Sequence, residues 1–150
     1  MADVFTPEKR SQVMARIRGR DTGPERKVRS LLHALGYRFT VHGPRNKSLP
    51  GKPDIVLPAR RTVIFVHGCF WHGHENCPDF RIPSSRTEWW TAKIAGNKAR
   101  DLRVQAELLA LGWHVVTIWA CAVKNKAATA WLENQIPALL GPPGRKNPGT

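Results

Sequence analysis

Apolar positions along the chain recur at spacings that predict helices alternating with strands. In residues 21–36 they fall at i, i+3, i+4 and i+7, the spacing of one helix face: Val28, Leu31, Leu32 and Leu35. Gly36 follows the last of them and is a typical helix end. The spacing therefore predicts an amphipathic helix that buries one face.

Short runs of apolar or β-branched residues predict four strands, at 37–41, 53–58, 62–67 and 113–119. The third run, TVIFVH, is apolar enough to be the central strand of a sheet. The segment 42–52 is expected to be a basic loop, and 68–86 an irregular loop.

Two further helices complete the predicted order of elements. One runs from about Thr87 to Leu111 and is ended by Gly112, and the other covers 126–140. The resulting order, α-β-β-β-α-β, predicts an α/β domain at 21–140 in which helices flank a mixed sheet.

The two ends of the chain differ from this domain in composition. Residues 1–20 are basic, and Thr6-Pro7 is a typical helix start, so we expect an N-terminal basic helical arm. The arm is either a solvated charged helix or one that lies along phosphates. Residues 141–150 are rich in Pro and Gly and are expected to be a disordered tail.

The charge of the chain indicates the class of partner. Lys and Arg number 24 against 11 Asp and Glu, a formal net charge of +13. A field of this sign and size favours polyanions, with nucleic acid ahead of a membrane surface.

Three observations indicate an intracellular protein. No window approaches the roughly eighteen apolar residues of a membrane span. The first residues, MADVFTPEKR, lack the apolar stretch of a signal peptide. The chain has 3 Cys, an odd number that argues against a disulfide framework and for thiolates in a reducing compartment.

One His and all three Cys residues have the positions of a structural zinc site: Cys69, His74, Cys77 and Cys121. The first three form a local clip. The last Cys follows the strand at 113–119 and the first follows the strand at 62–67, so both thiols emerge at one sheet edge if these strands are parallel neighbours. Such a closed site would order the loop at 68–86. The alternative is a buried apolar thiol at Cys121 and no metal.

A carboxylate at a strand end is the candidate catalytic group. Pro53-Asp54 opens the second predicted strand, beside the end of the third. This pattern and the element order resemble the PD-(D/E)xK nuclease core. Where the acidic residue, spacer and lysine of that motif belong, the chain has Val66-His67-Gly68. The alternative for Asp54 is a plain turn residue.

Five segments, RDTGPE, LPGKPDIV, VIFVHGCFWHGHENC, RTEWW and WACAV, resemble the very short patch repair (Vsr) endonuclease family. The resemblance covers about residues 9–123. It implies a restriction-endonuclease-like fold with structural Zn²⁺, and an Mg²⁺-dependent endonuclease that nicks duplex DNA beside the thymine of a T·G mismatch. That mismatch is the lesion left when 5-methylcytosine deaminates. The resemblance also implies a monomer in the bacterial cytoplasm, at the nucleoid when it acts, with downstream DNA repair proteins as further partners.

The resemblance also implies roles for individual residues. Asp54 and the main-chain carbonyl of Val66 would bind Mg²⁺, and Glu25 and His67 would hold metal-bound waters. His72 would be the general base or proton shuttle at the scissile phosphate. Alternatives remain open for three of them. A capping box with the preceding Thr also explains Glu25, and both histidines could be surface residues or zinc ligands, because spacing does not decide between His72 and His74.

Aromatic residues supply the candidate mismatch-binding surface. Phe70 and Trp71 lie on the clipped loop and could enter a base stack as a wedge. The resemblance adds Trp90 to this wedge and assigns Lys93 and Asn97, on the same helix face, to reading the mismatched pair. The alternative is that Trp90 covers the core and its neighbours are a solvated flank.

Two other functions fit part of this pattern. Another nuclease with the same core would share Asp54 but would give no reason for the Phe-Trp wedge. A non-enzymatic zinc module that binds DNA would explain the charge and the cysteines but leave Asp54 and His72 without a role.

Overall fold

The computed structural model describes residues 23–143. The expected basic arm at 1–20, the Thr of the expected capping box, and most of the expected tail (144–150) lie outside the described residues.

A three-stranded mixed sheet forms the centre of the described chain. Its strands are β1 (Ile55–Leu57), β2 (Thr62–His67) and β3 (His114–Trp119), in the order β1-β2-β3. β1 pairs antiparallel with β2, and β2 pairs parallel with β3, with His67 opposite Trp119. Parallel pairing of β2 and β3, the condition for both thiols to emerge at one sheet edge, is therefore met.

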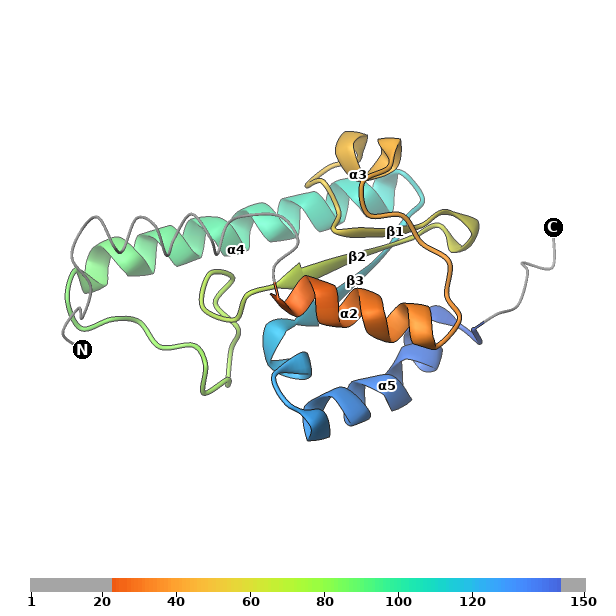
Figure 1. Cartoon of the computed structure of the whole chain (residues 1–150). Coiled ribbons are helices and arrows are strands. Elements are labelled where there is room, and N and C mark those ends of the chain that lie inside the picture. The colour runs from red at the N-terminus through yellow and green to blue at the C-terminus, as the bar shows by residue number, and fades with distance from the viewer. Residues whose placement is uncertain (1–22, 144–150) are drawn as a thin grey trace.

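Helices cover both faces of this sheet, as Figure 1 shows. The long helix α4 (Thr87–Ala110) connects β2 to β3 and lies over one face, while α2 (Gly23–Ala34) and α5 (Lys126–Leu140) lie over the other. Two short 3₁₀ turns are also present, η1 (Pro58–Arg60) between β1 and β2 and η2 (Ala120–Val123) after β3. In the part of the chain described here, no helix is both long and apolar enough to pass through a membrane.

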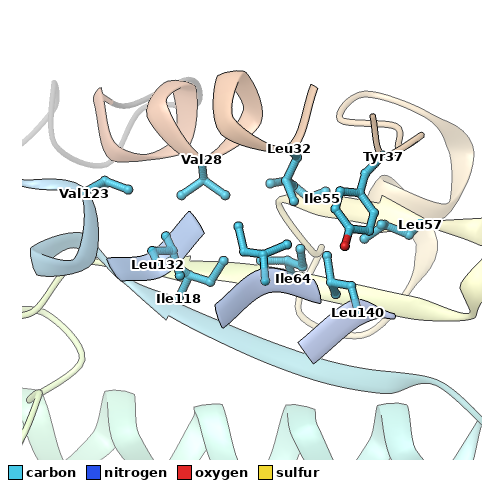
Figure 2. Packing of buried hydrophobic residues seen from close by; sticks show 11 residues of the cluster. Val28, Leu32, Tyr37, Ile55, Leu57, Ile64, Ile118, Val123, Leu132 and Leu140 are labelled. Atoms are coloured by element: carbon cyan, nitrogen blue, oxygen red, sulfur yellow. The ribbon is translucent and has the colours of Figure 1, made fainter. Parts of the chain in front are cut away.

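The larger core lies between the sheet and the helices α2 and α5 (Figure 2). The apolar stripe predicted for residues 21–36 supplies Val28 and Leu32, which are fully buried, and Leu31 and Leu35 pack at its margin. From the sheet, Ile64 contributes the matching surface on β2. Burial of several such side chains, each worth about 1.5–3 kcal/mol, is what attaches α2 to the sheet.

A second, smaller core lies under α4. Side chains alternate across a strand, so Val63 and Phe65 of β2 point to the face opposite Ile64. There they pack with Leu108, near the end of α4, and with Trp113. The central strand is thus buried on both faces, as the apolar run predicted.

The predicted strand at 37–41 is wrong in extent. Only Thr40 pairs with the sheet, through one isolated antiparallel bridge to Val56. The Asn46 side chain holds the turn that follows, because its Nδ2 donates to the Thr40 carbonyl at 3.0 Å and its Oδ1 accepts from the Gly43 N–H at 3.2 Å. The chain therefore turns away from the sheet, and the described order has three strands and not four.

The predicted loop at 42–52 contains a short helix, α3 (Pro44–Ser48). Pro44 at its first position has a backbone preset for a helix. Asn46 is 5% exposed, although amides favour the surface, and its Nδ2 also bonds the Pro53 carbonyl at 3.1 Å. This buried amide attaches α3 to the start of β1, where Asp54 lies.

Candidate active site and metal centre

The ends of β2 and β3 bring together the three thiols and one imidazole of the expected metal site. The ligand atoms of Cys69, His74, Cys77 and Cys121 all lie within 4.8 Å of one another. Cys121 Sγ is 3.6 Å from His74 Nδ1. Cys69 follows β2 and Cys121 follows β3, so the parallel pairing of these strands creates the site. The structure places His74, and not His72, with the thiols.

This donor set fits a tetrahedral zinc ion. Bonds of about 2.3 Å to sulfur and about 2.1 Å to nitrogen place neighbouring ligand atoms roughly 3.6 Å apart. Without a cation, burial raises the pKa of the Cys69 thiol to about 12, although a backbone hydrogen bond with Cys121 lowers this pKa in part. A bound metal ion reverses that preference, because coordinating thiols are deprotonated. Three thiolates and one imidazole leave no open position, as in structural sites.

The loop between the first Cys and the His is held by its own backbone and by α4. Its N–H groups close short turns, from His72 to the Gly68 carbonyl at 3.1 Å and from His74 to the Cys69 carbonyl at 2.9 Å. Gly73 has φ +62°, and a Cβ there would lie 2.7 Å from Ile94 Cγ2. The loop therefore rests directly on α4, and a glycine is required at this contact.

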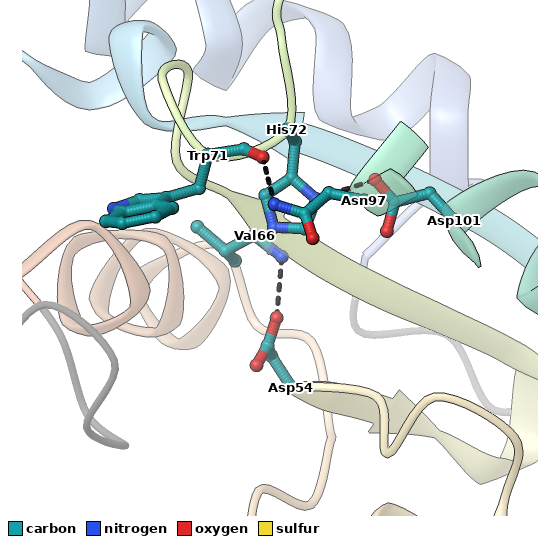
Figure 3. A network of polar contacts seen from close by, with 6 residues as sticks. All are labelled: Asp54, Val66, Trp71, His72, Asn97 and Asp101. Atoms are coloured by element: carbon teal, nitrogen blue, oxygen red, sulfur yellow. Dashed lines mark hydrogen bonds and ion pairs between the residues drawn. The ribbon is translucent and has the colours of Figure 1, made fainter. Parts of the chain in front are cut away.

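Asp54 lies where β1 begins and reaches across to β2. Its Oδ2 accepts a hydrogen bond from the Val66 N–H at 2.7 Å (Figure 3). The Asn46 Nδ2 donates to the Asp54 carbonyl at 3.3 Å. Hydrogen bonds thus hold both the main chain and the side chain of Asp54. Its carboxylate lies next to Val66, whose carbonyl was predicted as a metal ligand.

The surroundings of Asp54 make its negative charge costly. Burial raises the pKa of this carboxyl from 3.8 to about 7, and the charge of Glu25 raises it further. The Val66 hydrogen bond and the Arg29 charge lower it only in part. Both carboxylates line a cavity of about 120 Å³. Two neighbouring carboxylates with room beside them form a donor set that fits Mg²⁺, which takes oxygen ligands and keeps several waters.

His72 forms a dyad with Asp101, a residue of α4. His72 Nδ1 and Asp101 Oδ2 are 2.6 Å apart (Figure 3). A carboxylate only accepts, so this contact places a proton on Nδ1 and leaves Nε2 as the atom that can take a proton. The dyad thereby has the arrangement of a general base oriented by an acid.

His67 stacks on His72, with ring centroids 3.7 Å apart and planes at 3°. Burial lowers the pKa of His67 to about 4, and the neighbouring charge of His72 lowers it further, against an opposing effect of Asp101. His67 is therefore neutral near pH 7. A neutral neighbour lets His72 gain a proton without like-charge repulsion.

The two wedge candidates form an aromatic cluster with Trp90. Phe70 and Trp71 meet edge to face at 5.3 Å, and the Trp90 ring lies 5.1 Å from Phe70 and 5.7 Å from Trp71. Phe70 and Trp71 are partly exposed, whereas Trp90 is 6% exposed. Trp90 is thus buried against the other two rings from α4, and its place in the wedge stays a prediction.

The remaining predicted residues of α4 lie beside this cluster. Asn97 Nδ2 donates to the Trp71 carbonyl at 2.8 Å, so Asn97 positions the loop (Figure 3). Lys93 is exposed one turn earlier. Figure 3 also shows the Trp71 indole pointing away from the His72 ring. The side chains of Trp71 and His72 therefore leave this short loop in different directions.

Sequence reasoning missed two residues of the site. Asp101 continues the helix face of Asn97 by one turn, and extending that stripe would have found it. Trp119 stacks on His74 at 4.0 Å and meets His67 edge-on at 5.4 Å, so it touches both the metal centre and the histidine pair. Its position at the end of an apolar strand gave no such signal.

Comparison with known proteins supplies independent evidence. The family model described as DNA mismatch endonuclease Vsr matches residues 2–79. The chain is 48% identical over 142 residues to the type II nicking enzyme V.XorIIP of Xanthomonas oryzae, covering 95% of this chain and 99% of the relative. It is 45% identical over 126 residues to the DNA mismatch endonuclease Vsr of Escherichia coli, covering 84% and 78%. The type II nicking enzyme V.NmeAIP of Neisseria meningitidis is also 45% identical, over 127 residues, covering 85% and 88%.

Proposed function

The chain belongs to the Vsr family of DNA mismatch endonucleases, and on that basis we propose that it nicks one strand of duplex DNA beside the thymine of a T·G mismatch. Its role is then the repair of deaminated 5-methylcytosine. Relatives named as nicking enzymes and as a mismatch endonuclease make the activity class endonucleolytic hydrolysis of DNA.

One observation carries the proposal: a fixed carboxylate, an oriented histidine and a cluster of partly exposed aromatics meet around the end of β2. The Val66 N–H links Asp54 to that strand end, and the stacked histidines connect the strand to the loop. The aromatic cluster begins at Phe70, three residues after the end of β2. A substrate base opened by the aromatics would place its backbone next to the dyad.

The residues then divide the hydrolytic step among them. His72 Nε2 takes a proton from a water as the water oxygen bonds to phosphorus, and the bond from phosphorus to the leaving sugar oxygen breaks. Asp101 holds His72 in the required tautomer and stabilises its protonated form. Glu25 and neutral His67 hold and orient water at the site.

The proposed metals have separate roles. Asp54 and the Val66 carbonyl would hold Mg²⁺, which when bound stabilises the charge that develops on the phosphate oxygens. The three thiolates and His74 would hold Zn²⁺ as a structural ion. Zinc fixes the loop, and the loop carries both the general base and the wedge.

The mismatch is selected by the cost of opening a base step. Unstacking costs a few kcal/mol and is easiest at a mismatched pair. Phe70 and Trp71 would enter the stack, supported by Trp90. Lys93 and the side-chain Oδ1 of Asn97 would contact base edges. The basic surface supplies the sequence-independent part of the affinity. A single nick needs one active site, so the proposed form is a monomer.

The test is cleavage of a duplex with one T·G mismatch beside a matched T·A duplex of the same sequence, each labelled on either strand. With Mg²⁺ we expect one nick, next to the mismatched thymine, and none with EDTA. Equal cleavage of both duplexes would favour another nuclease of this core. If the protein binds the duplexes but cleaves neither with any divalent cation, the result would favour a DNA-binding zinc module.

Truncation of the wedge should separate recognition from general DNA binding. Stacking on an aromatic ring is worth about 1–3 kcal/mol per base. Phe70→Ala/Trp71→Ala should therefore lower the preference for T·G over T·A duplex by roughly 10- to 100-fold. Non-specific affinity and its salt dependence should remain, because they come from phosphate contacts.

The measurement is a pair of binding curves, on T·G and T·A duplexes, at two salt concentrations. Trp131→Ala, which removes an exposed tryptophan of α5, is the matched control and should change neither curve. Zinc content should be unchanged in both variants. Discrimination that survives the double substitution would assign mismatch reading to Lys93 and Asn97.

A further inference from the structure

The lysine of the PD-(D/E)xK motif has no counterpart on β2, where Val66, His67 and Gly68 stand in its place. The cavity at Asp54 is instead lined by two lysines that precede β1 in the sequence. Lys52, two residues before the carboxylate, and Lys47, on α3, both line it. A positive charge next to the reacting phosphate is thus available without the motif.

The backbone holds Lys52 in an unusual conformation. Its φ is +50°, a left-handed value that few residues other than glycine adopt. Such strain persists only where the surroundings enforce it, and it concentrates at functional sites. Here the Lys52 N–H donates to the Leu49 carbonyl at 3.0 Å, and the next residue, Pro53, is buried.

The preceding residue is packed against both α4 and β2. A Cβ on Gly51 would lie 2.4 Å from Val104 Cγ1 and 3.2 Å from the Phe65 ring. The turn therefore cannot shift toward the sheet. A lysine at its end starts from a fixed main-chain position, unlike an ordinary surface lysine on a mobile loop.

The charges around the cavity leave Lys52 available to a ligand. The charged groups that act on Asp54 are Glu25 and Arg29. Within residues 23–143, neither Lys47 nor Lys52 forms an ion pair with a carboxylate. Two exposed ammonium groups beside an oxygen-ligand site provide what a phosphodiester needs, since ammonium groups bind phosphate as point charges.

We propose that the Lys47–Lys52–Asp54 cavity binds a backbone phosphate of the cleaved DNA strand, with Lys52 as a catalytic residue that stabilises the negative charge developing on that phosphate. Lys47 contributes to binding alone. This inference rests on the proposed nicking function and adds a residue to it.

The experiment is single-turnover nicking of the T·G duplex at saturating enzyme, with DNA affinity measured separately. Lys52→Ala should lower the rate at saturation by about 10²-fold, the loss typical of removing one group that stabilises transition-state charge. Lys47→Ala, from the same cavity but an ordinary helical backbone, should lose affinity, with a salt slope smaller by about 1. Lys126→Ala, which removes an exposed lysine at the start of α5 outside this cavity, is the control and should keep the rate. Lys52→Arg should retain most of the rate, since the charge remains.

Lys52→Gly supplies a readout that a structural role would not produce. Glycine adopts φ +50° without strain, so this variant should keep or raise the melting temperature, by about 2–4 °C. Its nicking rate should fall as far as that of Lys52→Ala. A lysine that only supported the fold would lose rate and stability together.

Two outcomes overturn the inference in distinguishable ways. If the wild-type protein nicks but Lys52→Ala and Lys52→Gly match its rate at saturation, Lys52 is not catalytic, whatever their affinity. If the wild-type protein nicks no duplex with any divalent cation, the proposed function fails, and this inference fails with it.

Discussion

Asp54→Asn is expected to lower the nicking rate on a T·G duplex by at least about 10³-fold, the upper range for removing one group that stabilises transition-state charge. Asparagine keeps the size of the side chain and an oxygen that can accept from the Val66 N–H, so the β1–β2 geometry remains. What it removes is the negative charge that a magnesium ion requires. Affinity for the mismatched duplex should stay equal or become tighter, because a carboxylate that faces phosphate repels it.

The same substitution should stabilise the metal-free protein at alkaline pH. The folded-state pKa of Asp54 is about 7 against 3.8 for the free group, so the folded protein binds this proton more tightly. The associated stability is fully present below pH 4 and is lost as pH rises through 7. At pH 8 in EDTA, Asp54→Asn should therefore be more stable than wild type by roughly 2–4 kcal/mol, and at pH 4 nearly equal.

The difference between the two proteins is the informative quantity. His67 titrates in the opposite sense, because its pKa is lowered to about 4 and its contribution to stability is lost as pH falls from 6.5. That contribution is common to both variants and cancels. Urea unfolding at the two pH values measures the difference, and added Mg²⁺ should stabilise wild type alone.

A remote carboxylate serves as the control for this test. Glu133→Gln, on the exposed side of α5, makes the same change of net charge and should affect neither the rate nor the pH dependence. Wild-type nicking by Asp54→Asn would place the active site elsewhere. A stability difference independent of pH would mean that Asp54 does not titrate at the site.

The elements that bury a face against the sheet could be predicted from apolar spacing. The run 62–67 became β2 and the helix 126–140 became α5 with the predicted bounds, and α4 ends one residue before the predicted Leu111. In each case burial decides the structure, and burial has a period that the sequence displays. The parallel pairing that joins the thiols was only a condition in that analysis, because apolar spacing does not give the direction of a strand.

Side-chain hydrogen bonds decide the segment that was predicted wrongly. The run at 37–41 has the composition of a strand, but Asn46 bonds both the Thr40 carbonyl and the Gly43 N–H and so holds a turn after the single bridge. The same amide fixes α3 where a loop was expected. A buried polar side chain with several backbone partners overrides local propensity, and no apolar spacing reveals which Asn will be buried.

The histidines show a similar limit within the site. His72 and His74 are separated by one residue, so ligand spacing could not assign the metal to either. The fold does so through their partners: Asp101 comes from α4 and Trp119 from β3, both distant in sequence. Residues that contact a site from distant parts of the sequence can be identified only once the arrangement of the sheet and α4 is known.

Cys121→Ser is expected to remove most of the zinc that the wild-type protein should bind at one ion per chain. The hydroxyl of serine is a poor substitute for a thiolate, and the remaining three ligands leave the site open. Metal binding can supply on the order of 10 kcal/mol of folding free energy. Losing only about 3 kcal/mol of it would lower the melting temperature by about 10 °C in a domain of this size.

A chelator separates metal loss from damage to packing. Wild-type protein stripped of metal should melt near the temperature of Cys121→Ser, and the variant should not respond to the chelator. Elemental analysis gives the zinc content, and visible absorption of the Co²⁺-substituted protein reports whether the ligands are tetrahedral. A folded wild-type protein that holds no zinc and ignores the chelator would show that the three thiols are packing residues.

The effect of Cys121→Ser on function follows from which parts of the site the loop carries. His72 lies three residues after Cys69 and two before His74, so its 2.6 Å contact with Asp101 depends on a loop held at both ends. Phe70 and Trp71 lie in the same interval. At a temperature where the variant is still folded, it should therefore lose nicking and T·G preference together, whereas Phe70→Ala/Trp71→Ala loses mainly the preference. Non-specific affinity should persist in both, because the basic residues that contact phosphate do not depend on the thiols.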